Sequence, residues 1–341
     1  MVSALCLGAL TGCTVTEHTP VNHSQSPTAS ELIEQSKPYQ SAFPGLADLC
    51  DLSRPVRDLT VSGRQAHAPQ TSKTRRDMHN KRGKSQELAP AQVFSNLYFV
   101  GNAGVSAWVL KTSEGLILID ALNNTEQAKT YIEQGMQTLG LDPAELKYIV
   151  ITHEHGDHYG GQQYLTEKYG AQVMMSQIGW QRLSTGTTLL HSPRWGAAPK
   201  NPITLFDGDT LSLGQSQIQF ISTPGHTPGT LSLLFTVYDG EQPHTALLWG
   251  GTGLNYGPDV KRIEGYSRAA YKTREIAAAR QADVFLSNHP ARDQTDVRLA
   301  ALAQRNKGEA HPFVSSPENV QNGLTMLGLC TQARALQLQA E

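Results

Sequence analysis

The stretch ITHEHGDHYGG, residues 151–161, places three histidines and two acids within the six positions 153–158. The apolar run LKYIVIT, residues 146–152, comes directly before them and predicts a buried β-strand that ends at the cluster. Imidazole nitrogen and carboxylate oxygen together suit zinc or iron, and the cluster lacks the thiolates typical of a purely structural site. A polar loop with Asp157 as a helix N-cap would explain one acid but not three histidines. The stretch therefore predicts a metal centre at a strand end.

Two further histidines follow apolar runs in the same way. His226 lies between two Pro-Gly turns in STPGHTPGT, residues 222–230, and His289 ends DVFLSNH, residues 283–289. Either histidine alone would more often be an ordinary loop residue. Because all of these side chains follow strands, we expect them to emerge at one edge of the fold. The candidate ligands are His153, His155, Asp157, His158, His226 and His289.

The remaining sequence predicts two similar halves in which strands lead into helices. Regular structure is expected to begin near Val93, where β-branched and aromatic runs alternate with Gly, Asn and Ser. This order predicts an α/β fold with two mixed sheets packed face to face and helices outside, a four-layer αβ/βα sandwich. The expected strands are 93–101, 106–112, 115–120, 146–152, 171–176, 208–214, 218–225, 230–238, 245–251 and 283–289, and the expected helices are 124–140, 160–169, 266–282, 293–305 and 317–338.

The N-terminal part differs in character. Residues 1–13, MVSALCLGALTGC, are an apolar run that ends in small residues at a cysteine, which is typical of a secretory signal. LTGC resembles a bacterial lipoprotein signal with Cys13 as the lipidated residue, although no Lys or Arg precedes the run, so a plain export signal remains the alternative. Residues 14–91 predict a partly irregular extension, and residues 92–341 predict the folded domain with its C-terminal helix. We expect an exported, periplasmic protein, either free or membrane-anchored through Cys13.

Composition excludes several classes of partner. A net charge of -2 over 341 residues gives no reason to expect nucleic acid, and no run of about 18 apolar residues predicts a transmembrane helix. The basic patch at 64–84 would normally be a solvated face, and it would contact acidic lipid headgroups only in an anchored chain. The expected partner is a small-molecule substrate, and the sequence leaves the oligomeric state open.

Cysteine usage fits export. Cys6 and Cys13 belong to the expected leader, which leaves Cys50 and Cys330 near the two ends of the mature chain. An oxidising compartment would allow these two to form a disulfide, and the long loop that it closes favours a stabilisation of roughly 4 kcal/mol in the chain-entropy account. Two unrelated buried thiols are the alternative.

The motifs HEHGDH at 153–158, TPGHTPG at 223–229 and SNHP at 287–290 together resemble those of metallo-β-lactamase-fold hydrolases. The resemblance runs from about Val93 to at least residue 305 and is nearest to the third subclass of class B (zinc) β-lactamases. It implies two Zn²⁺ ions and a metal-bound hydroxide that opens a cyclic amide, above all a β-lactam. It assigns His153, His155 and His226 to the first ion, Asp157, His158 and His289 to the second, and orientation of the hydroxide to Asp157.

Other members of this superfamily use the same centre differently. Glyoxalase II enzymes and acyl-homoserine lactonases add a bridging aspartate where this chain has Gly250 and Gly251, and its absence favours the β-lactamase reaction. Flavodiiron relatives place a glutamate where this chain has His155, and RNase Z-type enzymes carry nucleic-acid features that this sequence lacks. A lactonase, a thioesterase, a phosphodiesterase and a non-catalytic metal-binding envelope lipoprotein remain as alternatives.

The resemblance also implies substrate contacts. Thr252 stands where the third subclass uses serines to hold the substrate carboxylate, and Asn255 and Tyr256 follow it as further contacts. In the loop 179–196, Trp195 is expected to cover a substrate.

Other side chains near the cluster and in this loop carry separate expectations. Trp180 is expected to pack against the sheet, and His191 is not expected to be a ligand. Either Arg182 or Arg194 would meet a substrate carboxylate, and Glu154 is expected to face outward.

Overall fold

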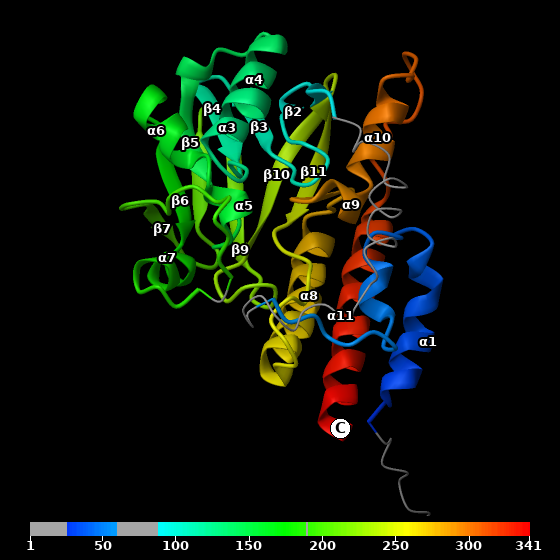
Figure 1. The fold of residues 1–341 in the computed structure, drawn as a ribbon. Helices are drawn as coiled ribbons and strands as arrows, with labels where there is room; N and C mark the ends of the chain where they lie inside the picture. The colour runs from blue at the N-terminus through cyan, green and yellow to red at the C-terminus, as the bar shows by residue number, and fades with distance from the viewer. Residues whose placement is uncertain (1–25, 60–87, 189) are drawn as a thin grey trace, which may run out of the picture.

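A computed structural model describes residues 26–59, 88–188 and 190–341 of the chain (Figure 1). The expected signal with Cys13 and the basic patch at 64–84 lie outside the described residues. No helix in the described ranges is long and apolar enough to cross a membrane.

The first sheet has seven strands in the order of the chain. Its first four strands pair antiparallel, and the last four pair parallel, so that the sheet is mixed. The strands are β1 (Ala91–Phe94), β2 (Leu97–Phe99), β3 (Trp108–Thr112), β4 (Gly115–Ile119), β5 (Leu146–Val150), β6 (Gln172–Ser176) and β7 (Ile203–Leu205).

The second sheet has five strands in the order β12-β11-β10-β9-β8. It is also mixed, because β11 pairs parallel with β12 and the other pairs are antiparallel. The strands are β8 (Thr210–Leu213), β9 (Ser216–Ser222), β10 (Leu231–Asp239), β11 (Gln242–Trp249) and β12 (Val284–Ser287).

Alternating apolar side chains bury both faces of each sheet. Along β4, Ile117 enters the core between the sheets, where Phe220 of the second sheet also lies, while Leu118 faces the outer cluster under the helices. On the far side, Leu234 and Trp249 pack with the helices of the second sheet. These clusters confirm the predicted sandwich of two sheets with helices outside.

Helices cover both outer faces (Figure 1). One helical run follows β4, and the Asn124 side chain caps it by accepting from the Gln127 N–H at 3.0 Å, as predicted. Its middle is a π-helical segment, η2 (Ala128–Glu133). The run begins with α3 (Thr125–Gln127) and ends with α4 (Gln134–Thr138). The helices that follow it are η3 (Pro143–Glu145), α5 (Gly156–Tyr159), α6 (Gln162–Tyr169), α7 (Gln177–Ser184), α8 (Val260–Ala279), α9 (Pro290–Asp293), α10 (Thr295–Leu302) and α11 (Pro317–Ala340).

The structure differs from the sequence prediction in several elements. The run 93–101 is a hairpin of β1 and β2 rather than one strand. Regular structure also begins well before Val93, because α1 (Ala29–Gln40) forms in the N-terminal extension. A capping box explains its start, since Thr28 and Glu31 each accept a hydrogen bond from the other's backbone N–H.

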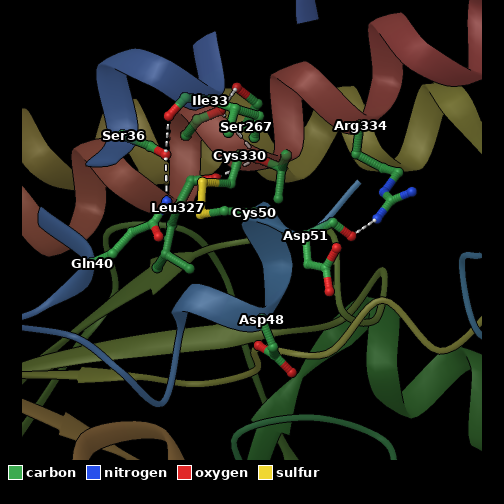
Figure 2. The surroundings of a disulfide bond; sticks show 12 residues. Ile33, Ser36, Gln40, Asp48, Cys50, Asp51, Ser267, Leu327, Cys330 and Arg334 are labelled. Atoms are coloured by element: carbon green, nitrogen blue, oxygen red, sulfur yellow. Dashed lines mark hydrogen bonds between the residues drawn. A yellow bond between two sulfur atoms is a disulfide. The ribbon is translucent and has the colours of Figure 1, made fainter. Parts of the chain in front are cut away.

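The extension is tied to the C-terminal helix (Figure 2). Cys50, at the end of η1 (Ala47–Cys50), forms a disulfide with Cys330 of α11. Beside it, the Arg334 guanidinium donates to the Asp51 carbonyl oxygen at 2.7 Å. The disulfide confirms the predicted pairing of Cys50 with Cys330.

Candidate metal centre

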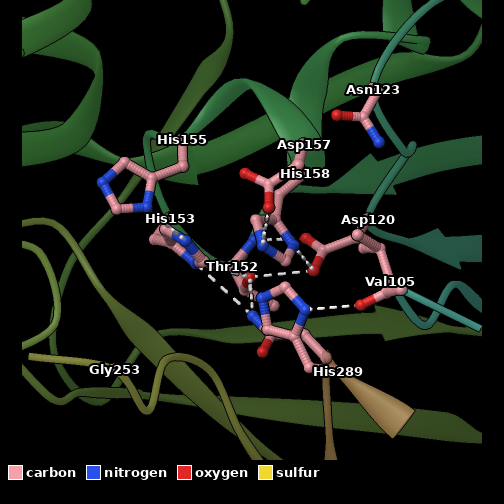
Figure 3. Close-up of polar contacts among 12 residues, drawn as sticks. Val105, Asp120, Asn123, Thr152, His153, His155, Asp157, His158, Gly253 and His289 are labelled. Carbon is pink, nitrogen blue, oxygen red and sulfur yellow. Dashed lines mark hydrogen bonds and ion pairs between the residues drawn. The ribbon is translucent and has the colours of Figure 1, made fainter. Parts of the chain in front are cut away.

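The candidate ligands lie where three strands end. Residues 153–158 follow β5 and run into α5, His226 lies in the loop between β9 and β10, and His289 follows β12. The structure therefore brings all six predicted ligands to one edge of the sandwich. Figure 3 shows His153, His155, Asp157, His158 and His289 among the side chains that meet there.

The first group consists of His153, His155 and His226. Three nitrogen atoms form a triangle with sides of 3.1 to 3.2 Å: Nε2 of His153, Nδ1 of His155 and Nε2 of His226. Tetrahedral zinc with Zn–N bonds of about 2.0–2.1 Å separates its ligand nitrogens by about 3.3 Å. The triangle therefore fits one zinc ion, and all three side chains are buried.

The second group consists of Asp157, His158 and His289, with one ligand atom from each within 4.8 Å of the others. Nε2 of His158 is buried and has no hydrogen-bond partner among the residues that the structure describes; it lies 3.6 Å from the Asp157 carboxylate. A buried nitrogen without a partner costs free energy, which a bound metal ion would offset. The rings of His153 and His158 have centroids 4.1 Å apart, so the two groups are adjacent.

Hydrogen bonds orient four of the histidine rings through the nitrogen that faces away from the ligand groups. In these four histidines that nitrogen is Nδ1, which leaves Nε2 as the ligand atom, whereas His155 presents Nδ1 to its group. The partners are Gly250 O for His153 at 2.9 Å, Gly253 O for His226 at 2.5 Å, Gly104 O for His289 at 2.7 Å and Asp120 Oδ2 for His158 at 2.7 Å.

Burial sets the charge of these imidazoles. It holds the pKa of His153 and His226 well below the usual value and lowers the pKa of His155 to about 3, so their lone pairs are free at neutral pH. At His158 burial also acts to lower the pKa, but the carboxylates of Asp157 and Asp120 outweigh it and raise the pKa. Neutral imidazoles beside carboxylates form the donor set that zinc prefers.

Asp120 is a residue of the site that the sequence reasoning missed. It follows β4 with a φ of 62°, and its carboxylate accepts from the Thr152 N–H at 2.8 Å, the Thr152 hydroxyl at 2.9 Å and Nδ1 of His158. The signal was an acid at the end of the apolar run GLILID, in the strand that pairs parallel with β5.

Glu154 was predicted to face outward, and this prediction is wrong. Its side chain is buried and accepts from the Thr227 hydroxyl at 2.6 Å and from the Gly229 N–H at 3.3 Å. The Arg182 guanidinium lies 3.4 Å from the same carboxylate. Glu154 thus joins the HEHGDH loop to the loop that carries His226, and Arg182 is engaged within the protein rather than free for a substrate.

The predicted substrate contacts occupy different surroundings. Asn255 lines a groove that His226 and His289 also line. Thr252 is only 1% exposed and Tyr256 only 8%, and neither lines this groove. The Arg262 guanidinium covers the ring of Tyr256 at 3.4 Å from its centroid.

The two tryptophans of the loop 179–196 have different surroundings. Trp180 packs against the outer cluster of the first sheet. Trp195 stacks beside the His155 ring, with centroids 6.2 Å apart and an angle of 21° between the planes. His191 is exposed and belongs to neither ligand group, and Arg194 is also exposed.

Gly251 lies against a ligand. A Cβ atom at this position would come within 2.7 to 2.9 Å of Cδ2, Cβ and Cγ of His226, so any side chain there would displace the His226 side chain or the loop. Glycine at this point permits the close approach of the backbone to the metal centre.

Comparisons with known proteins agree with this geometry. Residues 100–239 match the family model for the metallo-beta-lactamase superfamily. The structure of BJP-1, a subclass B3 metallo-β-lactamase of Bradyrhizobium japonicum, is 28% identical with a TM-score of 0.57 and covers 70% of this chain and 90% of its own. FEZ-1 from Legionella gormanii shares the fold, with a TM-score of 0.64 at 20% identity over 75% of this chain and 98% of its own.

Curated relatives match shorter stretches. The probable polyketide biosynthesis zinc-dependent hydrolase PksB of Bacillus subtilis is 33% identical over 112 residues, which are 32% of this chain and 44% of that protein. A hydroxyacylglutathione hydrolase of Acidiphilium cryptum is 33% identical over 90 residues, 26% of this chain and 31% of the relative. The chain thus spans less than half the length of either relative. The family match contains every candidate ligand except His289, and the chain shares the metallo-β-lactamase fold with solved subclass B3 enzymes.

Proposed function

We propose that this protein is a di-zinc hydrolase that opens a cyclic amide, with β-lactams as its substrate class. The observation that carries the proposal is the pair of adjacent ligand groups, made of imidazoles and one carboxylate, beside an open groove that His226 and His289 line. Zinc ions held there would supply Lewis acidity for the substrate carbonyl and would lower the pKa of water toward neutrality. An open groove and a set without cysteine support catalysis rather than a closed structural site.

The chain's own residues have distinct tasks in this reaction. The backbone carbonyls of Gly250 and Gly253 orient the rings of His153 and His226, and Asp120 orients His158. Asp157 keeps about a quarter of its side chain exposed at the centre. Its carboxylate is placed to accept a hydrogen bond from the attacking water and to direct the water toward the carbonyl carbon.

A thioester hydrolase is the second candidate, because one relative is named a hydroxyacylglutathione hydrolase. Gly251 argues against it. The resemblance implies a bridging aspartate at this point in glyoxalase II enzymes and lactonases, and the contact with the His226 ring leaves no room for an acidic side chain here. Cyclic amides therefore remain the better-supported class.

A substrate panel tests the proposal. Zinc-loaded protein is assayed with a chromogenic cephalosporin, a homoserine lactone, a thioester and a phosphodiester, and kcat/KM is compared. We expect the cephalosporin to give the highest value. Asp157→Ala should lower kcat/KM at least about 100-fold on every substrate that is turned over, whereas Glu167→Ala, which removes an exposed carboxylate from α6, should not. Turnover of none of the four would refute the hydrolase, and a preference for the thioester would select the second candidate.

We further infer that the protein works after export, free in the periplasm or anchored through a lipidated Cys13. The disulfide between Cys50 and Cys330 supports an oxidising compartment. The intact mass of the protein isolated from cells checks this, because a mass that still includes residues 1–12 would contradict it.

A further inference from the structure

The groove at the metal centre has one wall from the N-terminal extension. His226 and His289 line the groove together with Gly253 and Asn255, and Arg57 lines the same groove. A substrate that reacts at the centre and extends along this groove would meet the extension with its remaining groups.

Backbone pairing sets the position of Arg57. The Gly257 N–H donates to the Arg57 carbonyl oxygen at 3.1 Å, and the Leu59 N–H donates to the Asn255 carbonyl oxygen at 2.9 Å. Asp58 and Tyr256 therefore form an antiparallel bridge. The bridge couples Arg57 to the short segment that follows Gly253, whose carbonyl orients His226.

The pleat of this bridge separates the side chains. Successive residues of an extended chain point to opposite faces, so Arg57 and Asp58 diverge. Asp58 lies on the side of Tyr256, whose ring is buried beneath Arg262. The Arg57 side chain is exposed on the other side, into the groove that Asn255 also lines.

Charge pairing leaves Arg57 available. The other arginine that lines the groove, Arg292, donates to the Asp48 carboxylate at 2.6 Å and is neutralised. Arg182 lies against Glu154. Within the described ranges, the Arg57 guanidinium makes no ion pair or hydrogen bond that would neutralise it. An unpaired guanidinium at a substrate groove is suited to bidentate binding of a carboxylate.

We propose that Arg57 binds the carboxylate of the substrate while the scissile amide lies at the metal centre. This inference rests on the proposed function. It assigns the binding of the substrate carboxylate to Arg57, because Thr252 is buried and does not line the groove. The substrate class is thereby narrowed to anionic cyclic amides, and the N-terminal extension becomes part of the substrate site.

The test separates charge recognition from catalysis. A chromogenic cephalosporin is compared with its neutral methyl ester on zinc-loaded wild type, Arg57→Ala and Arg57→Lys. For the acid, Arg57→Ala should raise KM roughly 10-fold to 100-fold with kcat nearly unchanged, the loss expected for one charge-assisted contact. The ester should not respond. Arg57→Lys should recover part of the loss, since a lysine keeps the charge but not the bidentate geometry.

Arg54→Ala is the matched control, because Arg54 is an exposed arginine of the same extension that lines a different hollow and pairs with Asp51. It should leave both substrates unaffected. An equal effect of Arg57→Ala on acid and ester, or no effect on the acid, would overturn the proposal.

A binding measurement keeps this result distinct from the proposed function. Isothermal titration of zinc-loaded protein with the acid and with the ester gives the ratio of their Kd values without any turnover. If the wild type turns over neither compound but prefers the acid and loses this preference in Arg57→Ala, the hydrolase proposal fails and the Arg57 site stands. Equal binding of acid and ester by the wild type would refute the Arg57 site.

Discussion

Asp120 shows how a single side chain outside the ligand groups can control one of them. It accepts three hydrogen bonds, two from Thr152 and one from His158, and presents no donor of its own while ionised. These bonds hold the strand end before the HEHGDH loop and set the tautomer of His158.

Replacing Asp120 with asparagine should weaken metal binding. One carboxylate oxygen becomes an amide NH₂, which cannot accept from Thr152 or His158. We expect the affinity of the group that contains His158 to fall about 10-fold to 100-fold, measured by competition with a chromophoric chelator and by counting zinc per chain. Asp142→Asn is the control, because Asp142 is an exposed cap that accepts from the Ala144 N–H. Unchanged zinc affinity of the group that contains His158 would contradict the role of Asp120.

At the residue scale, the sequence predicted the ligand candidates but not the groups that hold them. His153 to His158 form one contiguous motif after a strand, and this local pattern is visible without a structure. Glu154 belongs to the same motif, yet its burial depends on Thr227 and Gly229, more than 70 residues away. Such contacts exist only once the two loops are packed together.

At the scale of the elements, α11 packs between α8 and α1 in the outer layer of the second sheet (Figure 1). Leu32 of α1 shares an apolar cluster with Leu329 and Ala333 of α11. The disulfide from η1 adds a covalent link to the same helix, across 280 residues of chain.

Removing this link should destabilise the fold. The double variant Cys50→Ser, Cys330→Ser regains the chain entropy that the bond removes from the unfolded state, and we expect the free energy of unfolding to fall by about 2–5 kcal/mol. Urea denaturation measures the change. Reducing the wild type should bring it to the stability of the variant, and the reductant should leave the variant itself unaffected. Equal midpoints for oxidised wild type and variant would show that the bond contributes nothing.

The elements themselves were largely predictable. Period-2 and period-3.6 patterns located most strands and the long helices because these patterns are local. The helix α1 was missed because its apolar face is short and gains its stability from α11, although its capping box was present in the sequence. The strand β7 was also missed, since it is short and only partly buried.

At the scale of the whole molecule, His311 joins the first sheet to the segment before α11. One ring nitrogen is hydrogen-bonded to the Val93 carbonyl at 2.8 Å, the other accepts from the Phe313 N–H at 3.2 Å, and the ring stacks on Phe94. Burial lowers the pKa of His311, and the Val93 carbonyl offsets only part of this effect.

The stability of the fold should therefore depend on pH through His311. In the unfolded chain its pKa is near 6.5, so below that pH the unfolded state binds a proton that the folded state excludes. Neutral His311 contributes to the free energy of unfolding above about pH 6.5, and this contribution is lost as the pH falls toward the lowered pKa of the folded state. The difference in unfolding free energy between zinc-saturated wild type and His311→Asn should shrink over that window, by up to about 1.4 kcal/mol per pH unit. A difference that is constant between pH 7.5 and 5 would contradict this assignment.

The sequence by itself determined the class of fold, the location of the candidate metal centre at the strand ends and the absence of a bridging acid at Gly251, because each is written in contiguous residues or in a local period. Only the tertiary structure decided which side chains support the centre and which are free to meet a substrate. Asp120, Glu154 and Arg57 are charged residues outside the predicted ligand set, and nothing local in the sequence distinguishes their roles; packing leaves the first two buried with partners and Arg57 exposed at the groove. The physical reason is that burial and charge pairing are properties of the contacts between distant segments, which no local pattern specifies.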